Sequence, residues 1–185
     1  MDLHNQEGKV TFTVMKIPAL ELTDEQKSRT LNWIEKLESG EFLQITSVLR
    51  GVKNGIPYGI GYCCLGVACE ISGLGKWGTE IPSGKIFQHL FVLNGEVPSP
   101  SNAYESLPPS QVIQDWFGMP EDVGFEIILN RSRFRTDDRE KYHIKRLPGL
   151  NDAGVTFAEI AKVLRAAVNG GYTNSQYDPT ISVER

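Results

Sequence analysis

One arrangement occurs twice in this sequence and limits the folds open to it: an N-terminal capping box followed by an amphipathic helical pattern. Thr23 is followed three residues later by Gln26, and Thr156 by Glu159. At this spacing the two side chains exchange hydrogen bonds with the backbone of the first helical turn. Apolar residues then recur every three to four positions until a glycine ends each pattern. Both segments therefore predict helices with one apolar face, which other parts of the chain must cover.

The rest of the chain predicts shorter elements. Alternating or continuous apolar runs and Gly or Pro breaks indicate strands at 10–17 and 85–95, a loop or hairpin at 51–61, and helices at 63–72 and 109–118. The segment 41–51 is apolar enough for a short helix or a turn into the core. We expect an α+β fold: a single compact helix-rich domain with a small antiparallel sheet.

Length and composition agree with one globular domain. The chain has 185 residues, of which 40% are hydrophobic and 23% charged. We expect an N-terminal strand or arm at 1–22, a globular domain at 23–170 and a C-terminal tail at 171–185. No apolar run approaches the ~20 residues of a membrane-spanning helix, and the first residues do not resemble a signal peptide. A cytoplasmic protein with reduced thiols is expected, without membrane association.

Charge is distributed unevenly. The formal net charge is −4, yet the segment 131–146 contains seven basic and three acidic residues. An acidic protein with one short basic segment is poorly suited to long nucleic acid, which favours a broad basic surface. Such a segment suits a small, compact anion better. The alternative is a solvated loop whose charges pair among themselves.

Three cysteines, Cys63, Cys64 and Cys69, fall within seven positions. A structural zinc site needs four ligands at paired spacings, and the nearest histidine is His89. We therefore expect no metal and no other cofactor. Free cysteine is also among the most buried residue types, so the alternative interpretation is that these thiols fill a tightly packed helix.

Nucleophilic catalysis is the competing interpretation of the thiols. The string that begins at Cys64 resembles the start of the catalytic helix in papain-like cell-wall peptidases, although Leu65 stands where that family has serine. Such an enzyme needs a histidine as base, for which His89 and His143 are the candidates. Neither histidine lies in a recognisable motif, so we expect a protein that is not an enzyme.

Three motifs together resemble a large family of small proteins encoded by tailed bacteriophages and prophages. They are WIEKLESGEFLQ at 33–44, YCCLGVACE at 62–70 and LNDAGVTF at 150–157, in the family's order. The first motif departs from the family by one residue, because three rather than two residues separate Trp33 from Leu37. The middle motif is the specific one, and the resemblance spans most of residues 30–168.

The resemblance implies a function as a phage sponge protein. Such proteins evade CBASS immunity in the host cytoplasm by sequestering a cyclic dinucleotide such as cGAMP without cleaving it, often as homo-oligomers. A protein that sequesters a cyclic dinucleotide needs cationic side chains to bind the phosphates, aromatic rings to stack on the bases and polar groups to form hydrogen bonds with the base edges. The expected ligand-binding residues are Tyr62, Trp77, Arg131, Arg133, Arg135, Tyr142, Lys145, Asn151 and Asp152. Asn151 and Asp152 can equally serve only to begin the loop before the last helix. The remaining alternatives are a hydrolase using Cys64 and a protein that inhibits a host enzyme through the basic segment.

Overall fold

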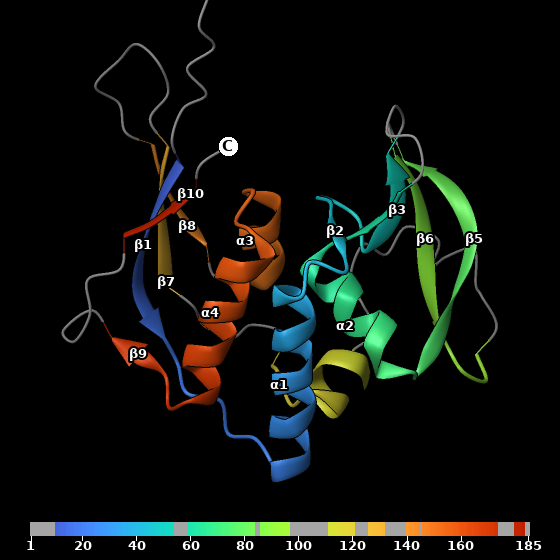
Figure 1. Ribbon diagram of the computed structural model, residues 1–185, viewed down its shortest axis with the longest axis horizontal. Coiled ribbons are helices and arrows are strands. Elements are labelled where there is room, and N and C mark those ends of the chain that lie inside the picture. The colour runs from blue at the N-terminus through green and yellow to red at the C-terminus, as the bar shows by residue number, and fades with distance from the viewer. Residues whose placement is uncertain are drawn as a thin grey trace, which may run out of the picture.

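Two β-sheets flank a layer of helices in the computed structural model of this protein (Figure 1). The structure describes residues 10–53, 59–83, 86–96, 111–120, 126–131, 140–144, 146–173 and 180–183. In Figure 1 the sheet that contains β1 and β7 lies on the left, and the sheet that contains β3, β5 and β6 lies on the right. The helices α1, α2 and α4 lie between them.

The helices of the described residues include one that the sequence did not predict, at 147–152, and two that begin at predicted capping boxes. They are α1 (Asp24–Glu38), α2 (Cys64–Ser72), the π-helix η2 (Gln111–Trp116), α3 (Leu147–Asp152) and α4 (Phe157–Val168). Both predicted capping boxes are present, at Thr23 with Gln26 and at Thr156 with Glu159. Gly73 ends α2 in the left-handed conformation, with φ of 67°, which a residue without Cβ adopts at little cost.

The first sheet joins both ends of the described chain. Its strands are β1 (Val10–Ile17), β7 (Glu126–Arg131), β8 (Glu140–Ile144), β9 (Tyr172–Thr173) and β10 (Thr180–Val183), in the order β10-β1-β7-β8 with β9 also on β1. All of these pairs are antiparallel. We expected a tail from residue 171, but this segment contains β9 and β10. Both strands complete the hydrogen-bonding edge of β1, a long-range pairing that has no local signal.

The second sheet contains the predicted hairpin and the predicted strand at 85–95. Its strands are β2 (Leu43–Gln44), β3 (Arg50–Lys53), β4 (Ile60–Tyr62), β5 (Gly75–Ser83) and β6 (Ile86–Leu93), in the order β2-β4-β3-β6-β5. Only β2 and β4 are parallel. The segment 41–51, for which we expected a helix or a turn, instead contains β2 and the start of β3. The α+β class is confirmed, and the structure adds that the described strands form two sheets rather than one.

One hydrophobic core connects the helices to both sheets. Its central side chains, with no measurable exposure, are Trp33, Ile34, Val67, Ile160 and Leu164. The backbone of α2 lies very close to the backbone at Leu49, and this requires a glycine at position 66. A Cβ on residue 66 would lie 1.8 Å from the Leu49 carbonyl oxygen. Among the described residues, no helix has the length and apolarity needed to cross a membrane.

Candidate functional site

The predicted ligand-binding residues belong to different sheets. Arg131 ends β7 and Tyr142 lies in β8, both in the first sheet. Tyr62 ends β4 and Trp77 lies in β5, both in the second sheet across the helical layer (Figure 1). These four residues therefore do not form a single site.

Three further predicted residues, Arg133, Arg135 and Lys145, lie outside the described residues. The hypothesis that the basic segment binds the ligand thus stays a prediction. In the second sheet, by contrast, two of the predicted residues, Tyr62 and Trp77, lie side by side.

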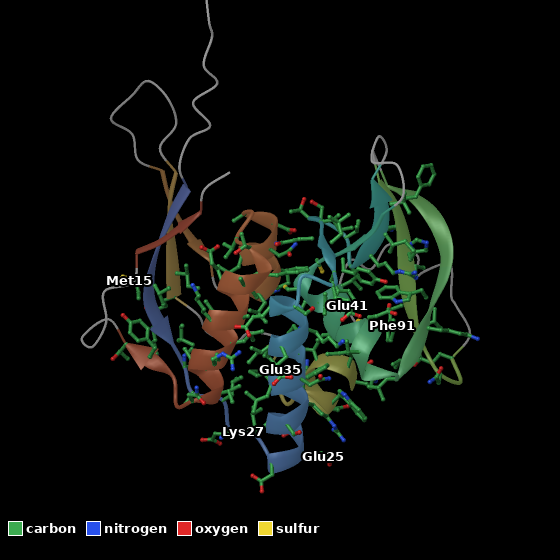
Figure 2. The ribbon with its side chains drawn as sticks, in the orientation of Figure 1. Met15, Glu25, Lys27, Glu35, Glu41 and Phe91 are labelled. Atoms are coloured by element: carbon green, nitrogen blue, oxygen red, sulfur yellow. The ribbon has the colours of Figure 1, made fainter. Side chains whose placement is uncertain are left out.

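Tyr62 and Trp77 are brought together by the second sheet. Their ring centroids lie 6.1 Å apart with an interplanar angle of 71°. Phe42 contacts the Tyr62 ring and Phe91 contacts the Trp77 ring, each edge-on with centroids 5.1 Å apart. Figure 2 shows Phe91 on the side of β6 that faces α2. Tyr62 and Trp77 are only half-buried, so this aromatic group extends from the core to solvent.

An arginine that the sequence did not single out completes this group. Arg50 lies directly opposite Tyr62 on β4 and opposite His89 on β6, because β3 is the strand between them. Its guanidinium carbon lies 5.6 Å from the Tyr62 ring centroid and 5.1 Å from the Trp77 ring centroid. Both distances fall within the range of cation–π attraction. Its Nε atom is buried and has no hydrogen-bond partner within the described residues.

Glu70 on α2 joins the two rings through a single oxygen. Its Oε2 atom accepts hydrogen bonds from the Tyr62 hydroxyl at 3.3 Å and from the Trp77 indole nitrogen at 2.5 Å. Partial burial, followed by the negative charge of Glu70, raises the pKa of Tyr62, although Arg50 acts in the opposite direction. Tyr62 is therefore a neutral hydrogen-bond donor at physiological pH.

We name Arg50, Tyr62, Glu70 and Trp77 the aromatic–arginine site. It combines a cation, two partly exposed rings and a carboxylate on one face of the second sheet. Guanidinium groups bind phosphate oxygens through paired hydrogen bonds, and aromatic rings and guanidinium planes stack on nucleobases. This combination fits a ligand that has both an anionic group and a planar ring.

The polar atoms of Asn151, by contrast, bind other parts of the protein. It is completely buried; its Oδ1 accepts from Gln44 Nε2 at 3.1 Å and from the Cys64 backbone N–H at 3.3 Å. Its Nδ2 donates to the Ile45 carbonyl at 2.8 Å. Asn151 therefore joins three segments of the chain, and the structure gives it an architectural role.

The same junction includes two residues of the first motif, Gln44 and Trp33, and Cys64 of the middle motif. Gln44 also donates to the Val155 carbonyl at 2.7 Å and accepts from the Phe157 backbone N–H at 2.9 Å. Trp33 donates its indole N–H to the Cys64 carbonyl at 3.0 Å. We name Trp33, Gln44, Cys64 and Asn151 the motif junction, since each of the three motifs contributes to it.

Asp152 follows the motif junction but lies on the surface. Its Oδ1 accepts a hydrogen bond from the Ser47 backbone N–H at 2.8 Å. Ser47 has a positive φ of 71°, so this bond supports a backbone conformation that serine rarely adopts. The exposed position leaves the Asp152 carboxylate accessible, while this contact gives it a structural partner.

The thiols differ in their chemistry. Cys63 is the N-cap of α2, and its sulfur accepts from the Gly66 backbone N–H at 3.4 Å. A hydrogen bond from the Cys64 thiol, and then backbone N–H groups, lower the pKa of Cys63. Interaction with Cys63 and burial raise the pKa of Cys64 well above its usual range, and burial does the same for Cys69. The most acidic thiol is thus Cys63, which is 6% exposed, rather than Cys64.

The arrangement gives the hydrolase alternative little support. Cys64 has no measurable exposure, and its sulfur lies 3.8 Å from the Leu147 carbonyl oxygen. His89 belongs to β6 in the second sheet and His143 to β8 in the first. Among the described residues, no three His, Cys, Asp or Glu side chains are grouped as metal ligands would be.

Comparison with protein families identifies a domain that covers most of the chain. The model of a domain of unknown function, DUF8296, matches residues 25–168. This range includes the motif junction and the whole aromatic–arginine site. Comparison with curated proteins and with solved structures finds no match.

Proposed function

This chain belongs to the DUF8296 family, and from its aromatic–arginine site we propose that it binds and sequesters a cyclic nucleotide second messenger without cleaving it. The ligand is a cyclic dinucleotide such as cGAMP. The setting is that implied by the resemblance to phage proteins, namely evasion of CBASS immunity in the host cytoplasm.

One observation carries this proposal: a half-buried arginine lies over two partly exposed aromatic rings. Arg50 is within 5.6 Å of both ring centroids, and its buried Nε has no hydrogen-bond partner within the described residues. Arg50 as a whole is only half-buried, and its guanidinium carries five N–H donors that suit the oxygens of a phosphate. A phosphate on Arg50 places the attached nucleoside beside the rings of Tyr62 and Trp77.

The chemistry of the site favours binding over cleavage. Phosphodiester cleavage needs an activated nucleophile or a general base near the phosphate. Arg50 cannot act as a base, the pKa of Tyr62 is raised, and the Glu70 carboxylate already accepts from both rings. These four side chains can hold a ligand but offer no clear route to hydrolyse it.

A cyclic dinucleotide has two bases and two phosphates, whereas one chain supplies one aromatic–arginine site. We therefore expect a homo-oligomer in which two copies contact one ligand. Sedimentation with and without ligand measures this, and a complex of one chain with one ligand would contradict it.

The decisive experiment is isothermal titration calorimetry with a panel of cyclic dinucleotides and trinucleotides. We expect tight binding of at least one member, and replacement of Arg50 by alanine to weaken that binding at least about tenfold. Arg29→Ala is the matched control, since Arg29 also lies over a tryptophan ring, 3.5 Å from the centroid of Trp116. Absence of binding to every nucleotide would refute the proposal.

Labelled ligand then separates sequestration from catalysis. After incubation with the protein and denaturation, we expect the label to be recovered as intact nucleotide. Recovery of a linear or shorter nucleotide would instead identify an enzyme.

A further inference from the structure

Only one oxygen of the Glu70 carboxylate accepts hydrogen bonds from the described residues. Its Oε2 accepts from both Tyr62 and Trp77, while no described residue donates a hydrogen bond to Oε1. Glu70 is exposed, so its carboxylate can accept a further hydrogen bond from a ligand. A carboxylate has about four acceptor positions in all, and Oε1 keeps its own.

The Oε1 atom of Glu70 also affects which nucleobase can bind at the rings of Tyr62 and Trp77. Both ring donors point at Glu70, so the carboxylate marks the polar edge of the aromatic pair. A nucleobase that stacks beside the ring of Tyr62 or Trp77 therefore brings one of its own edges close to the carboxylate of Glu70. A carboxylate can only accept hydrogen bonds, so this edge must present donors.

Purines differ in this respect. The Watson–Crick edge of guanine presents two neighbouring donors, the ring N1–H and the amino group at C2. Adenine presents one amino donor beside the N1 lone pair, which a carboxylate repels. Hypoxanthine keeps the ring N1–H of guanine but lacks the amino group.

Resting on the proposed function, we propose that Glu70 makes the aromatic–arginine site selective for guanine-containing cyclic nucleotides. Arg50 holds the phosphate, the rings hold the base, and Glu70 Oε1 accepts from the guanine edge. The opposite charges of Arg50 and Glu70 thus match two different parts of the same ligand. Glu70 also positions both rings, so its two oxygens have separate tasks.

The test compares three ligands with the same cyclic backbone: cyclic di-GMP, cyclic di-IMP and cyclic di-AMP. Calorimetry on the full-length protein should give the tightest binding for the guanine ligand. We expect about tenfold weaker binding of the hypoxanthine ligand and still weaker binding of the adenine ligand, as for loss of a well-placed base contact.

Glu70→Gln separates base selection from ring positioning. The amide oxygen can keep one ring contact, but its NH2 group repels the guanine donors, so the guanine preference should shrink at least about fivefold. Glu96→Gln, at an exposed position, is the control and should leave all affinities unchanged. An equal loss for all three ligands would reduce Glu70 to a structural role and overturn the inference.

The outcomes distinguish this inference from the function on which it rests. Equal binding of the three ligands by the unmodified protein, or a preference for adenine, would overturn guanine selection and leave sequestration intact. If none of the three ligands nor any other cyclic nucleotide binds, the proposed function and the inference both fail.

Discussion

Most of the motif junction is buried whereas the aromatic–arginine site reaches solvent, although the Tyr62–Glu70 motif contributes to both. Cys64 has no measurable exposure and its backbone joins Trp33 and Asn151, whereas Tyr62 and Glu70 reach solvent. The cysteines, which are the most recognisable part of the motif, serve the buried region. A distinctive motif therefore need not mark the residues that contact a ligand.

The two regions also treat their polar groups differently. Both polar atoms of the Asn151 side chain have a protein partner and the side chain is completely buried, so it is not accessible to a ligand. Arg50 retains a buried Nε without a partner in the described part of the chain, and Glu70 retains one oxygen. Buried polar groups of a stable fold are usually hydrogen-bonded, so a buried group without a partner requires an explanation, and a functional role is one.

The largest effect is expected at Asn151. Replacement by alanine should lower the free energy of unfolding by about 3–5 kcal/mol, because Ile45 O, Gln44 Nε2 and Cys64 N–H each lose a buried partner. Urea denaturation measures this. The control is Asp152→Ala, which removes one exposed contact and should cost about 1 kcal/mol. Similar losses for both variants would contradict the architectural role of Asn151.

A slightly smaller loss is expected at Gly66. An alanine Cβ would collide with the Leu49 carbonyl oxygen, so α2 must shift, at a cost of about 3 kcal/mol in unfolding free energy. Thermal and urea denaturation report this change. Gly40→Ala is the comparison, since Gly40 has open space but a φ of 72°, and should cost about 1–2 kcal/mol. A smaller loss at Gly66 than at Gly40 would show that the close approach is unimportant.

In the aromatic–arginine site, Trp77→Ala should separate binding from stability. Loss of its contacts with Arg50 and Phe91 should lower the unfolding free energy by about 1–2 kcal/mol. Binding of the cyclic dinucleotide should weaken about tenfold or more, as for loss of a stacking ring. Trp116→Ala is the matched control, because Trp116 is also half-buried under an arginine and should affect stability alone. Equal effects of both variants on affinity would refute the assignment.

Thiol labelling should rank the cysteines by pKa and burial. With iodoacetamide under native conditions, we expect slow modification of Cys63 and none of Cys64 or Cys69, because thiolates are the reactive species. Mass spectrometry of peptides gives the positions. Labelling in urea is the control and should reach all three thiols. Native labelling of Cys64 before Cys63 would revive the hydrolase hypothesis.

The smallest effect concerns alkaline pH. The pKa values of Cys64 and Cys69 are raised in the folded protein, so the unfolded chain releases these protons at lower pH than the folded one. Their contribution to stability is complete below the ordinary thiol pKa of about 8.5 and is lost as pH rises through the folded values. Cys69→Ala should show a weaker decline of unfolding free energy above that pH. An unchanged slope would contradict the raised pKa of Cys69.

Local signals allowed much of the secondary structure to be predicted. The capping boxes at Thr23 and Thr156 and the helix that ends before Gly73 depend on residues a few positions apart. The strands β9 and β10 were not predicted, because their partner β1 lies more than 150 residues away. In the same way, Tyr62 and Trp77 were predicted as possible ligand contacts, while Arg50 and Glu70 were not.

The sequence by itself determined the α+β class and the two helices that begin at capping boxes, since each depends on local spacing. Only the tertiary structure decided which side chains meet. Strand register placed Arg50 beside Tyr62, and the packing of α2 on the second sheet brought Glu70 to both rings. Register and packing result from long-range burial of apolar surface, which no short stretch of sequence encodes.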